Sequence, residues 1–271
     1  HFVDTKNKIK FFNNSMLGQL SGKLNLESKL RKAISKKEFK LHYQPQLECK
    51  TNKVVGVEAL IRCQKFKECG ISPEEFISLA EETGMILELG EWIIDAALKQ
   101  LKIWHNKGYN NLLISINIAP QQFQQDNFVL KIEKLLQKHQ IEAKYLELEI
   151  TERTVIKDVN YTVEVLNELK KLGVLVSIDD FGTGYSSLEY LNRFALDKLK
   201  IDKSFVHNNN NLKIVKTIIV MGKNLGLEVV AEGVETQQEL EFLINNNCNY
   251  YQGYYFSKPK KAAEIEKYFE K

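Results

Sequence analysis

Two adjacent carboxylates, Asp179 and Asp180, follow an apolar run at the point where it meets a glycine-rich segment. Residues 174–187 have the sequence VLVSIDDFGTGYSS. Desolvating a carboxylate is costly unless a cation or hydrogen-bond donors meet it. Asp and Gly are ordinary turn residues, so a turn cap is one interpretation of the pair. The other is a metal site, because one carboxylate can bridge two cations about 3.5–4 Å apart while its neighbour binds the second, and such a cation pair cleaves phosphodiesters.

Polar residues also end the other runs that predict strands. Side chains alternate along a strand, and in a parallel barrel the carboxyl ends of all strands form one rim, where sites are built. So many acids at one rim would repel one another unless cations lie among them, and the side-chain cations available are Arg62 and Lys200. We therefore expect bound divalent metal. The residues at these ends are Glu58, Arg62, Ser115, Asn117, Glu147, Glu149, Glu152, Asp179, Asp180, Lys198, Lys200, Asp202, Glu232, Glu235 and Gln252.

Several of these residues also have a structural interpretation when each is taken alone. Glu147 and Lys198 come early in their strands and could form an interior pair. Glu152 and Glu235 could be first-turn acids, which the dipole of a following helix favours.

The type of metal follows from the type of ligand. Carboxylate and amide oxygens are hard ligands that suit Mg²⁺, Mn²⁺ or Ca²⁺. No histidine lies at a predicted strand end in ligand spacing, which argues against a zinc hydrolase and against a His-Asp type of phosphodiesterase. The five histidines are His1, His42, His105, His139 and His207.

Strand and helix patterns alternate after residue 25, which predicts a (β/α)₈ barrel with a doubly wound open sheet as the alternative. Only a half-dozen residues join the first two strands, so we expect a hairpin and one antiparallel strand. Ser72 and Pro73 are typical of a helix start. The predicted strands are 40–47, 54–62, 112–118, 145–151, 174–180, 196–202, 228–234 and 250–256, and the predicted helices are 73–83, 86–107, 120–139, 154–171, 211–225, 236–246 and 260–270.

Length, charge and composition limit the classes of protein to which this chain can belong. A chain of 271 residues can form one large barrel, and a net charge of +3 with interspersed signs argues against a DNA or RNA partner. The four cysteines form no CxxC pair and predict free thiols in a reducing compartment. No apolar run approaches the length of a membrane span, so we expect the chain as given to be cytoplasmic.

Seven motifs in fixed order resemble the EAL family of bacterial cyclic di-GMP phosphodiesterases. The resemblance covers about residues 27 to 271 and implies a barrel with an antiparallel first strand. It also implies hydrolysis of cyclic di-GMP to linear pGpG with Mg²⁺ or Mn²⁺. We expect Ca²⁺ to be inhibitory, because it takes six to eight oxygens at longer distances than Mg²⁺. The motifs are EALIR (58–62), SINIAPQQF (115–123), ELEITE (147–152), IDDFGTGYSSL (178–188), KLKID (198–202), AEGVE (231–235) and QGYYFSKP (252–259).

The resemblance also implies roles for individual positions. The first metal would be held by Glu58, Asn117, Glu149 and Asp179, and the second by Asp179 as a bridge, Asp180 and Glu232. Lys200 would orient or activate the attacking water, Glu152 would hold the loop 181–187, and Glu235 and Gln252 would complete the site. The dinucleotide would contact Gln44, Leu60 and Arg62.

Few positions depart from the family pattern. Cys63 replaces a usual Trp and Ala119 a frequent Ser, while HNNNN at 207–211 leaves the local geometry open. Residues 1–25 do not fit the barrel: DTKNKIKFF is similar to the closing strand of a GGDEF domain, so we expect the tail of an upstream GGDEF-like domain plus a linker, then the EAL barrel over 26–271. In the full-length protein, GGDEF or sensory domains upstream would be partners, and they could anchor it to a membrane.

Two further expectations come from the family, and two alternatives stay open. The family suggests a homodimer through the 181–190 loop region. A catalytically silent receptor that binds cyclic di-GMP and signals to a protein partner is the main alternative to an enzyme. An enolase-like Mg²⁺ barrel would have fewer rim acids and no Asp-Asp pair before a glycine loop.

Overall fold

The computed structural model describes residues 14–156, 158–182, 188–207 and 211–269. Its eight strands close into a barrel in chain order, with β8 returning to β1. The predicted (β/α)₈ barrel is confirmed, and the alternative open sheet is wrong. The strands are β1 (Phe39–Glu48), β2 (Val54–Cys63), β3 (Leu113–Ile118), β4 (Leu146–Thr151), β5 (Leu175–Phe181), β6 (Lys198–Ile201), β7 (Glu228–Ala231) and β8 (Tyr250–Tyr251).

The first strand runs against both of its neighbours. β1 pairs with β2 and with β8 in antiparallel fashion, and the other neighbouring strands are parallel. Residues 49–53 alone separate β1 from β2, which is too short for a parallel crossover. The hairpin confirms the predicted antiparallel strand and places Gln44 opposite Glu58.

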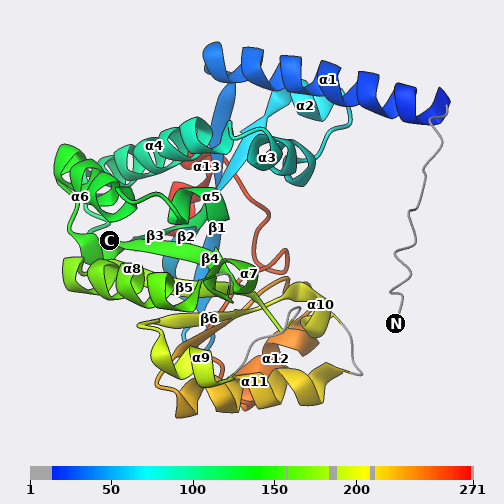
Figure 1. Cartoon of the computed structure of the whole chain (residues 1–271). Helices are drawn as coiled ribbons and strands as arrows, with labels where there is room; N and C mark the ends of the chain where they lie inside the picture. The colour runs from blue at the N-terminus through cyan, green and yellow to red at the C-terminus, as the bar shows by residue number, and fades with distance from the viewer. Residues whose placement is uncertain (1–13, 157, 183–187, 208–210, 270–271) are drawn as a thin grey trace, which may run out of the picture.

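Helices surround the barrel, as Figure 1 shows. α4 contacts β3, α8 contacts β5, and α11 contacts both β6 and β7. α3 begins as predicted, because the Ser72 side chain accepts from the backbone of Glu75 while Glu75 accepts from the backbone of Ser72. The helices are α1 (Asn14–Ser35), α2 (Gln64–Glu68), α3 (Pro73–Glu82), α4 (Ile86–Asn106), α5 (Pro120–Phe123), α6 (Phe128–His139), α7 (Glu152–Ile156), α8 (Val159–Leu172), α9 (Leu188–Arg193), α10 (Lys203–Val206), α11 (Leu212–Asn224), α12 (Gln237–Asn245) and α13 (Ala262–Ile265).

Three predicted helices are wrong in their extent. The segment 120–139 forms α5 and α6, divided by the polar residues 124–127, which favour turns over helix interiors. The segment 154–171 forms α7 and α8, because the Asp158 side chain accepts from the Tyr161 backbone at 3.1 Å and starts a new helix. The segment 260–270 holds only α13 and the 3-10 turn Glu266–Tyr268.

The last three predicted strands are shorter than expected, and β8 ends at Tyr251. Beyond it the chain turns and folds back onto Val234, whose N–H donates to the Gln252 carbonyl at 3.1 Å and whose carbonyl accepts from Tyr255 at 2.9 Å. A Cβ on Gly253 would lie 2.0 Å from the Val234 oxygen, so this close approach requires glycine. The predicted strand 250–256 is therefore wrong after its second residue.

Two predicted regions lie partly outside the described residues. Residues 1–13 belong to the predicted GGDEF-like tail, and α1 runs without interruption across the predicted boundary at residue 25. α1 packs on α3, and Figure 1 shows it along the top of the molecule. The predicted dimer region 181–190 includes residues 183–187, which are not described. No described helix has both the length and the low polarity that a bilayer crossing requires.

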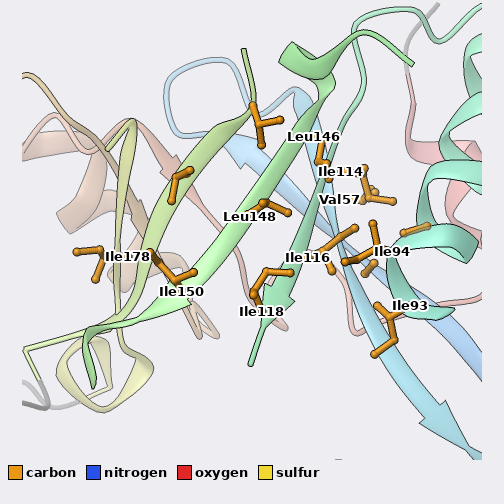
Figure 2. Close-up of a cluster of buried hydrophobic side chains, with 14 of the residues drawn as sticks. Val57, Ile93, Ile94, Ile114, Ile116, Ile118, Leu146, Leu148, Ile150 and Ile178 are labelled. Carbon is orange, nitrogen blue, oxygen red and sulfur yellow. The ribbon is translucent and has the colours of Figure 1, made fainter. Parts of the chain in front are cut away.

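The apolar side chains of the strands face outward and pack under the helices. Figure 2 shows Ile93 and Ile94 of α4 beside Val57 of β2 and Ile114 and Ile116 of β3. The alternate residues of the same strands face the barrel interior, and many of them are polar. These include Gln44, Gln46, Glu58, Ser115, Glu147, Glu149, Ser177, Asp179, Lys198 and Lys200, all of them buried. The core therefore lies between sheet and helices, while the interior carries charge.

Candidate active site

Lys200 on β6 is the buried cation at the centre of the candidate site. Its side chain is 1% exposed, and its Nζ lies 2.6 Å from Glu149 Oε2, 2.7 Å from Glu232 Oε1 and 3.2 Å from Asp179 Oδ1. Burial alone would lower the pKa of Lys200, but the nearby carboxylates raise this pKa well above its ordinary value. Lys200 is therefore a fixed positive charge between β4, β5 and the end of β7.

Asp179 and Asp180 converge although adjacent strand residues normally point to opposite faces. Asp180 has a φ of 55°, and the pairing of β5 with β6 is irregular between Ile178 and Phe181. This bulge re-aims Asp180, so that one carboxylate oxygen from each of Asp179, Asp180 and Glu232 lies within 4.8 Å of the others. Three acids can therefore share one ion.

Glu58 on β2 extends the site towards β1, β3 and β8. Asn117 Nδ2 donates to Glu58 Oε1 at 2.6 Å, and Gln252 Nε2 donates to Glu58 Oε2 at 2.5 Å. Gln252 also donates to Gln44 Oε1 at 3.1 Å. Two amides therefore fix the position of the Glu58 carboxylate.

Glu149 on β4 bonds Lys200 through Oε2 and accepts from Gln46 Nε2 at 3.5 Å through Oε1. Burial raises the pKa of Glu149 well above its ordinary value, Lys200 opposes this shift, and the charge of Glu58 adds to it. Glu149 thus lies where negative charge is in excess.

The pKa values of Glu232 and Asp180 show the same excess of negative charge. Burial and then the charge of Asp179 raise the pKa of Glu232 to about 8 and the pKa of Asp180 to about 6. These raised pKa values reflect the crowding of negative charge, which a bound divalent cation would offset.

The donor set fits a hard divalent cation. It consists of carboxylates and one amide oxygen, without thiol or imidazole, which suits Mg²⁺ or Mn²⁺ better than Zn²⁺. The residues that would hold the ions are Glu58, Asn117, Glu149, Asp179, Asp180 and Glu232.

Glu152 lies at the start of α7, beside the segment that follows β5. Its side chain is 3% exposed, and its Oε2 accepts a hydrogen bond from the Gly182 backbone at 3.4 Å. The remaining part of the predicted loop contact, residues 183–187, is outside the described chain.

Three predicted site residues lie apart from the acids that surround Lys200. Arg62 is half-buried at the end of β2, where its Nη1 donates to the Ile61 carbonyl at 2.7 Å. Leu60 is half-buried on the same strand. Glu235 is exposed directly before α12, and no hydrogen bond among the described residues joins its side chain to the other acids.

A second ion pair lies deeper in the barrel. Lys198 Nζ is 2.6 Å from Glu147 Oε2, with side-chain exposures of 3% and 0%. This confirms the interior pair that was one interpretation of these two residues. The sequence analysis missed Gln46, which bonds Glu149, and Ser115, whose Oγ donates to Gln46 Oε1 at 3.3 Å. Their signal was the polar residue at every second position of strands β1 and β3.

Comparison with known families decides the identity of this barrel. Residues 27–259 match the family described as "EAL domain". The chain belongs to the EAL domain family. The matched range includes Lys200 and the acids around it, and Glu58 opens the sequence EAL at 58–60.

Two curated relatives of this EAL domain come from well-known bacteria. The chain is 43% identical over 267 residues to the signaling protein YkoW of Bacillus subtilis, covering 97% of this chain and 33% of YkoW. It is 38% identical over 264 residues to the bifunctional diguanylate cyclase/cyclic di-GMP phosphodiesterase MucR of Pseudomonas aeruginosa, covering 96% of this chain and 38% of MucR. The EAL domain therefore spans about a third of the length of these relatives.

Solved structures agree with the barrel of this EAL domain. The PaMucR phosphodiesterase in complex with c-di-GMP superposes with a TM-score of 0.85 at 39% identity, over 89% of this chain and 99% of that chain. An EAL domain protein from Listeria monocytogenes superposes with a TM-score of 0.75 at 32% identity, over 87% and 94% of the two chains.

Proposed function

We propose that this EAL domain is a metal-dependent phosphodiesterase that hydrolyses cyclic di-GMP to linear pGpG. The observation that carries the proposal is the surplus of acids around one buried lysine. Glu149, Asp179 and Glu232 contact Lys200, and Asp180 adds a fourth carboxylate. A structural ion pair needs one acid for one lysine, whereas this excess has a purpose once divalent cations bind.

Relatives support the coarser statement that the activity is cyclic di-GMP hydrolysis. MucR is named a bifunctional diguanylate cyclase/cyclic di-GMP phosphodiesterase, and NbdA of Pseudomonas aeruginosa, 38% identical over 267 residues, is named a cyclic di-GMP phosphodiesterase. The PaMucR structure contains c-di-GMP. The two-metal arrangement is our extension from the residues, and the product is the one that the resemblance to the EAL family implies.

Individual side chains of the domain have different roles in the proposed reaction. Two bound cations would supply charge stabilisation at the phosphodiester. Lys200 holds a positive charge at a fixed point beside Asp179 and Glu232, where it can orient a water molecule for attack. Arg62 at the end of β2 suits a phosphate oxygen of the substrate, because a guanidinium can donate two hydrogen bonds to it.

Glu152 has a different task in this proposal. It keeps the backbone of Gly182 in place through its Oε2 and thereby supports the segment that follows Asp179 and Asp180. Gln252 supports Glu58 by donating to it, and Gln44 in turn accepts a hydrogen bond from Gln252. Leu60 and Glu235 would contact the substrate or complete the site in the loaded state.

Incubation of the purified chain with cyclic di-GMP, followed by chromatography of the nucleotides, tests this function. We expect pGpG with Mg²⁺ or Mn²⁺ and none with a chelator. Ca²⁺ should support binding without hydrolysis, because it takes six to eight oxygens at longer distances than Mg²⁺ and so loosens the site. Intact cyclic di-GMP in every metal, together with measurable binding, would identify the silent receptor instead.

We also propose the larger context that the sequence suggests. Residues 1–25 would be the tail of a GGDEF-like domain plus linker, and the 181–190 region would form a homodimer. Light scattering of the purified chain tests the dimer, and a monomer at concentrations that support full activity would contradict a dimer that is needed for catalysis.

A further inference from the structure

A buried amide on β1 reaches one of the candidate metal ligands from inside the barrel. Gln46 is 2% exposed, and it lies opposite Gly56 in the β1–β2 hairpin, two residues before Glu58 on the way to the carboxyl rim. Its Nε2 donates to Glu149 Oε1 at 3.5 Å. Because β2 and β3 separate β1 from β4, this bond crosses the barrel interior. Gln46 therefore contacts a candidate ligand without lying at the open end of the barrel.

The oxygen of the Gln46 amide is also held. Ser115 on β3 is fully buried, and its Oγ donates to Gln46 Oε1 at 3.3 Å. An amide oxygen only accepts hydrogen bonds, and an amide nitrogen only donates them. A hydroxyl donor at Oε1 therefore favours the orientation in which Nε2 faces Glu149, whose ionised oxygens only accept. Ser115 and Gln46 thus form a short chain of hydrogen bonds that ends on the carboxylate.

The two oxygens of Glu149 have different partners. Lys200 Nζ lies 2.6 Å from Oε2, and Gln46 Nε2 donates to Oε1. Without Gln46, the carboxylate could turn both of its oxygens towards the ammonium group of Lys200. A carboxylate oxygen has two lone pairs, so an oxygen that accepts one hydrogen bond can still bind a metal ion. Gln46 therefore keeps Oε1 from turning onto the lysine and leaves it able to bind an ion.

We infer that Gln46 is a positioning residue for the metal site, and that Ser115 acts through Gln46 to fix the orientation of Glu149. This inference rests on the proposed function, because it concerns the ions that the proposed reaction requires. Hydrogen-bond partners of metal ligands typically change metal affinity by about 10-fold to 100-fold. Both residues are too deeply buried to contact the substrate, so they act through Glu149 alone.

A purely structural role for the two residues makes a different prediction. A buried polar group without a partner is costly, so Ser115 and Gln46 could simply satisfy each other. Both roles predict a less stable fold after substitution. Only the positioning role predicts that the folded variant binds metal more weakly, so metal affinity discriminates between the two.

Calorimetric titration of the metal-free, folded chain with Mn²⁺ tests the inference without any turnover. Gln46→Met keeps the length of the side chain and removes both amide groups, so it should weaken the affinity for at least one ion by about 10-fold to 100-fold. Ser115→Ala leaves Gln46 in place but lets its amide turn, so the loss should be smaller, at least about 3-fold. Urea unfolding measures the stability of each variant separately, and Ser115→Ala carries the test if Gln46→Met does not fold.

Ser177→Ala is the matched control. Ser177 on β5 is as deeply buried as Ser115 and lies opposite Glu149 in the β4–β5 pairing. Its Oγ has no hydrogen-bond partner among the described residues, so its removal breaks no contact with the ligands. Ser177→Ala should bind Mn²⁺ like wild type. Equal losses of affinity in Ser115→Ala and Ser177→Ala, or wild-type affinity in both Ser115→Ala and Gln46→Met, would overturn the inference.

Turnover of cyclic di-GMP by the wild-type chain with Mn²⁺ separates this inference from the proposed function. Turnover by wild type, together with unchanged Mn²⁺ affinity in Gln46→Met and Ser115→Ala, refutes the positioning role and supports the function. The predicted losses of affinity without turnover by wild type support the positioning role and refute the enzyme. A wild-type chain that binds no Mn²⁺ refutes both.

Discussion

Two lysines on β6 lie two residues apart in the same barrel interior and have different surroundings. Lys198 contacts one acid, Glu147, at 2.6 Å, whereas Lys200 contacts three. We call the surroundings of Lys198 the lower level and those of Lys200 the upper level. β4 supplies a glutamate at both levels, but β5 places Ser177 beside Lys198 and Asp179 beside Lys200. Burial and ion pairing are common to both levels, so they do not mark a site. The feature that marks the site is the surplus of acids around Lys200 at the upper level.

Around Lys198, one lysine pairs with one acid. Lys198 Nζ also lies 5.2 Å from the centre of the Tyr250 ring, and the Tyr250 hydroxyl donates to Glu228 at 3.0 Å. The one acid that contacts Lys198 is already paired with it, so there is no surplus of acid around this lysine. Substitutions at the upper level, around Lys200, should therefore reduce activity, whereas substitutions at the lower level, around Lys198, should reduce the stability of the fold.

The largest effect should come from Asp179→Asn. If Asp179 bridges two cations, a neutral amide cannot serve both, and activity should disappear. Asp180→Asn should lose most catalysis and still bind one cation and some substrate through Glu58, Asn117 and Glu149. Assays of activity and nucleotide binding on both variants compare the two acids. Wild-type rates in both would support a turn cap instead, because Asn caps turns about as well as Asp.

Lys200→Ala should reduce kcat by about 10²–10⁴-fold, since it removes the group that positions the attacking water. Steady-state kinetics measure this reduction, and cyclic di-GMP binding should persist. A rate near that of wild type would remove Lys200 from the mechanism.

At the lower level, Lys198→Met should destabilise the fold by about 3–5 kcal/mol, because it leaves Glu147 buried and unpaired. The double variant Lys198→Met/Glu147→Leu should regain most of this stability, since both charges are gone. Urea unfolding measures the free energies, and kcat of the folded double variant should stay near wild type. A large loss of kcat in the stable double variant would mean that the two levels are not separate.

Arg62→Ala should have the smallest effect and should act mainly on KM. It removes a phosphate contact that exists both before and during the reaction, so kcat should change little. A large fall in kcat at unchanged KM would contradict this role and give Arg62 a part in the chemical step.

The sequence predicted the barrel because strand and helix patterns alternate along the chain, and apolar and polar residues alternate clearly along β3, β4 and β6. It also predicted which residues share the carboxyl rim, since period-two alternation decides which face each residue takes. It did not predict how Asp180 reaches the side of Asp179, because a bulge with a φ of 55° breaks that alternation. The turn at 252–257 was missed for a related reason: the close contact of Gly253 with Val234 joins residues far apart in the chain.

A metal-binding measurement tests most directly whether the surplus of acids around Lys200, and not the Lys198–Glu147 pair, forms a metal site. Calorimetric titration of the metal-free chain with Mn²⁺ should show two ions per chain for wild type and for Lys198→Met/Glu147→Leu. The same titration should show loss of binding for Asp179→Asn. A wild-type chain that binds no Mn²⁺, or an Asp179→Asn variant that still binds two ions, would contradict this account.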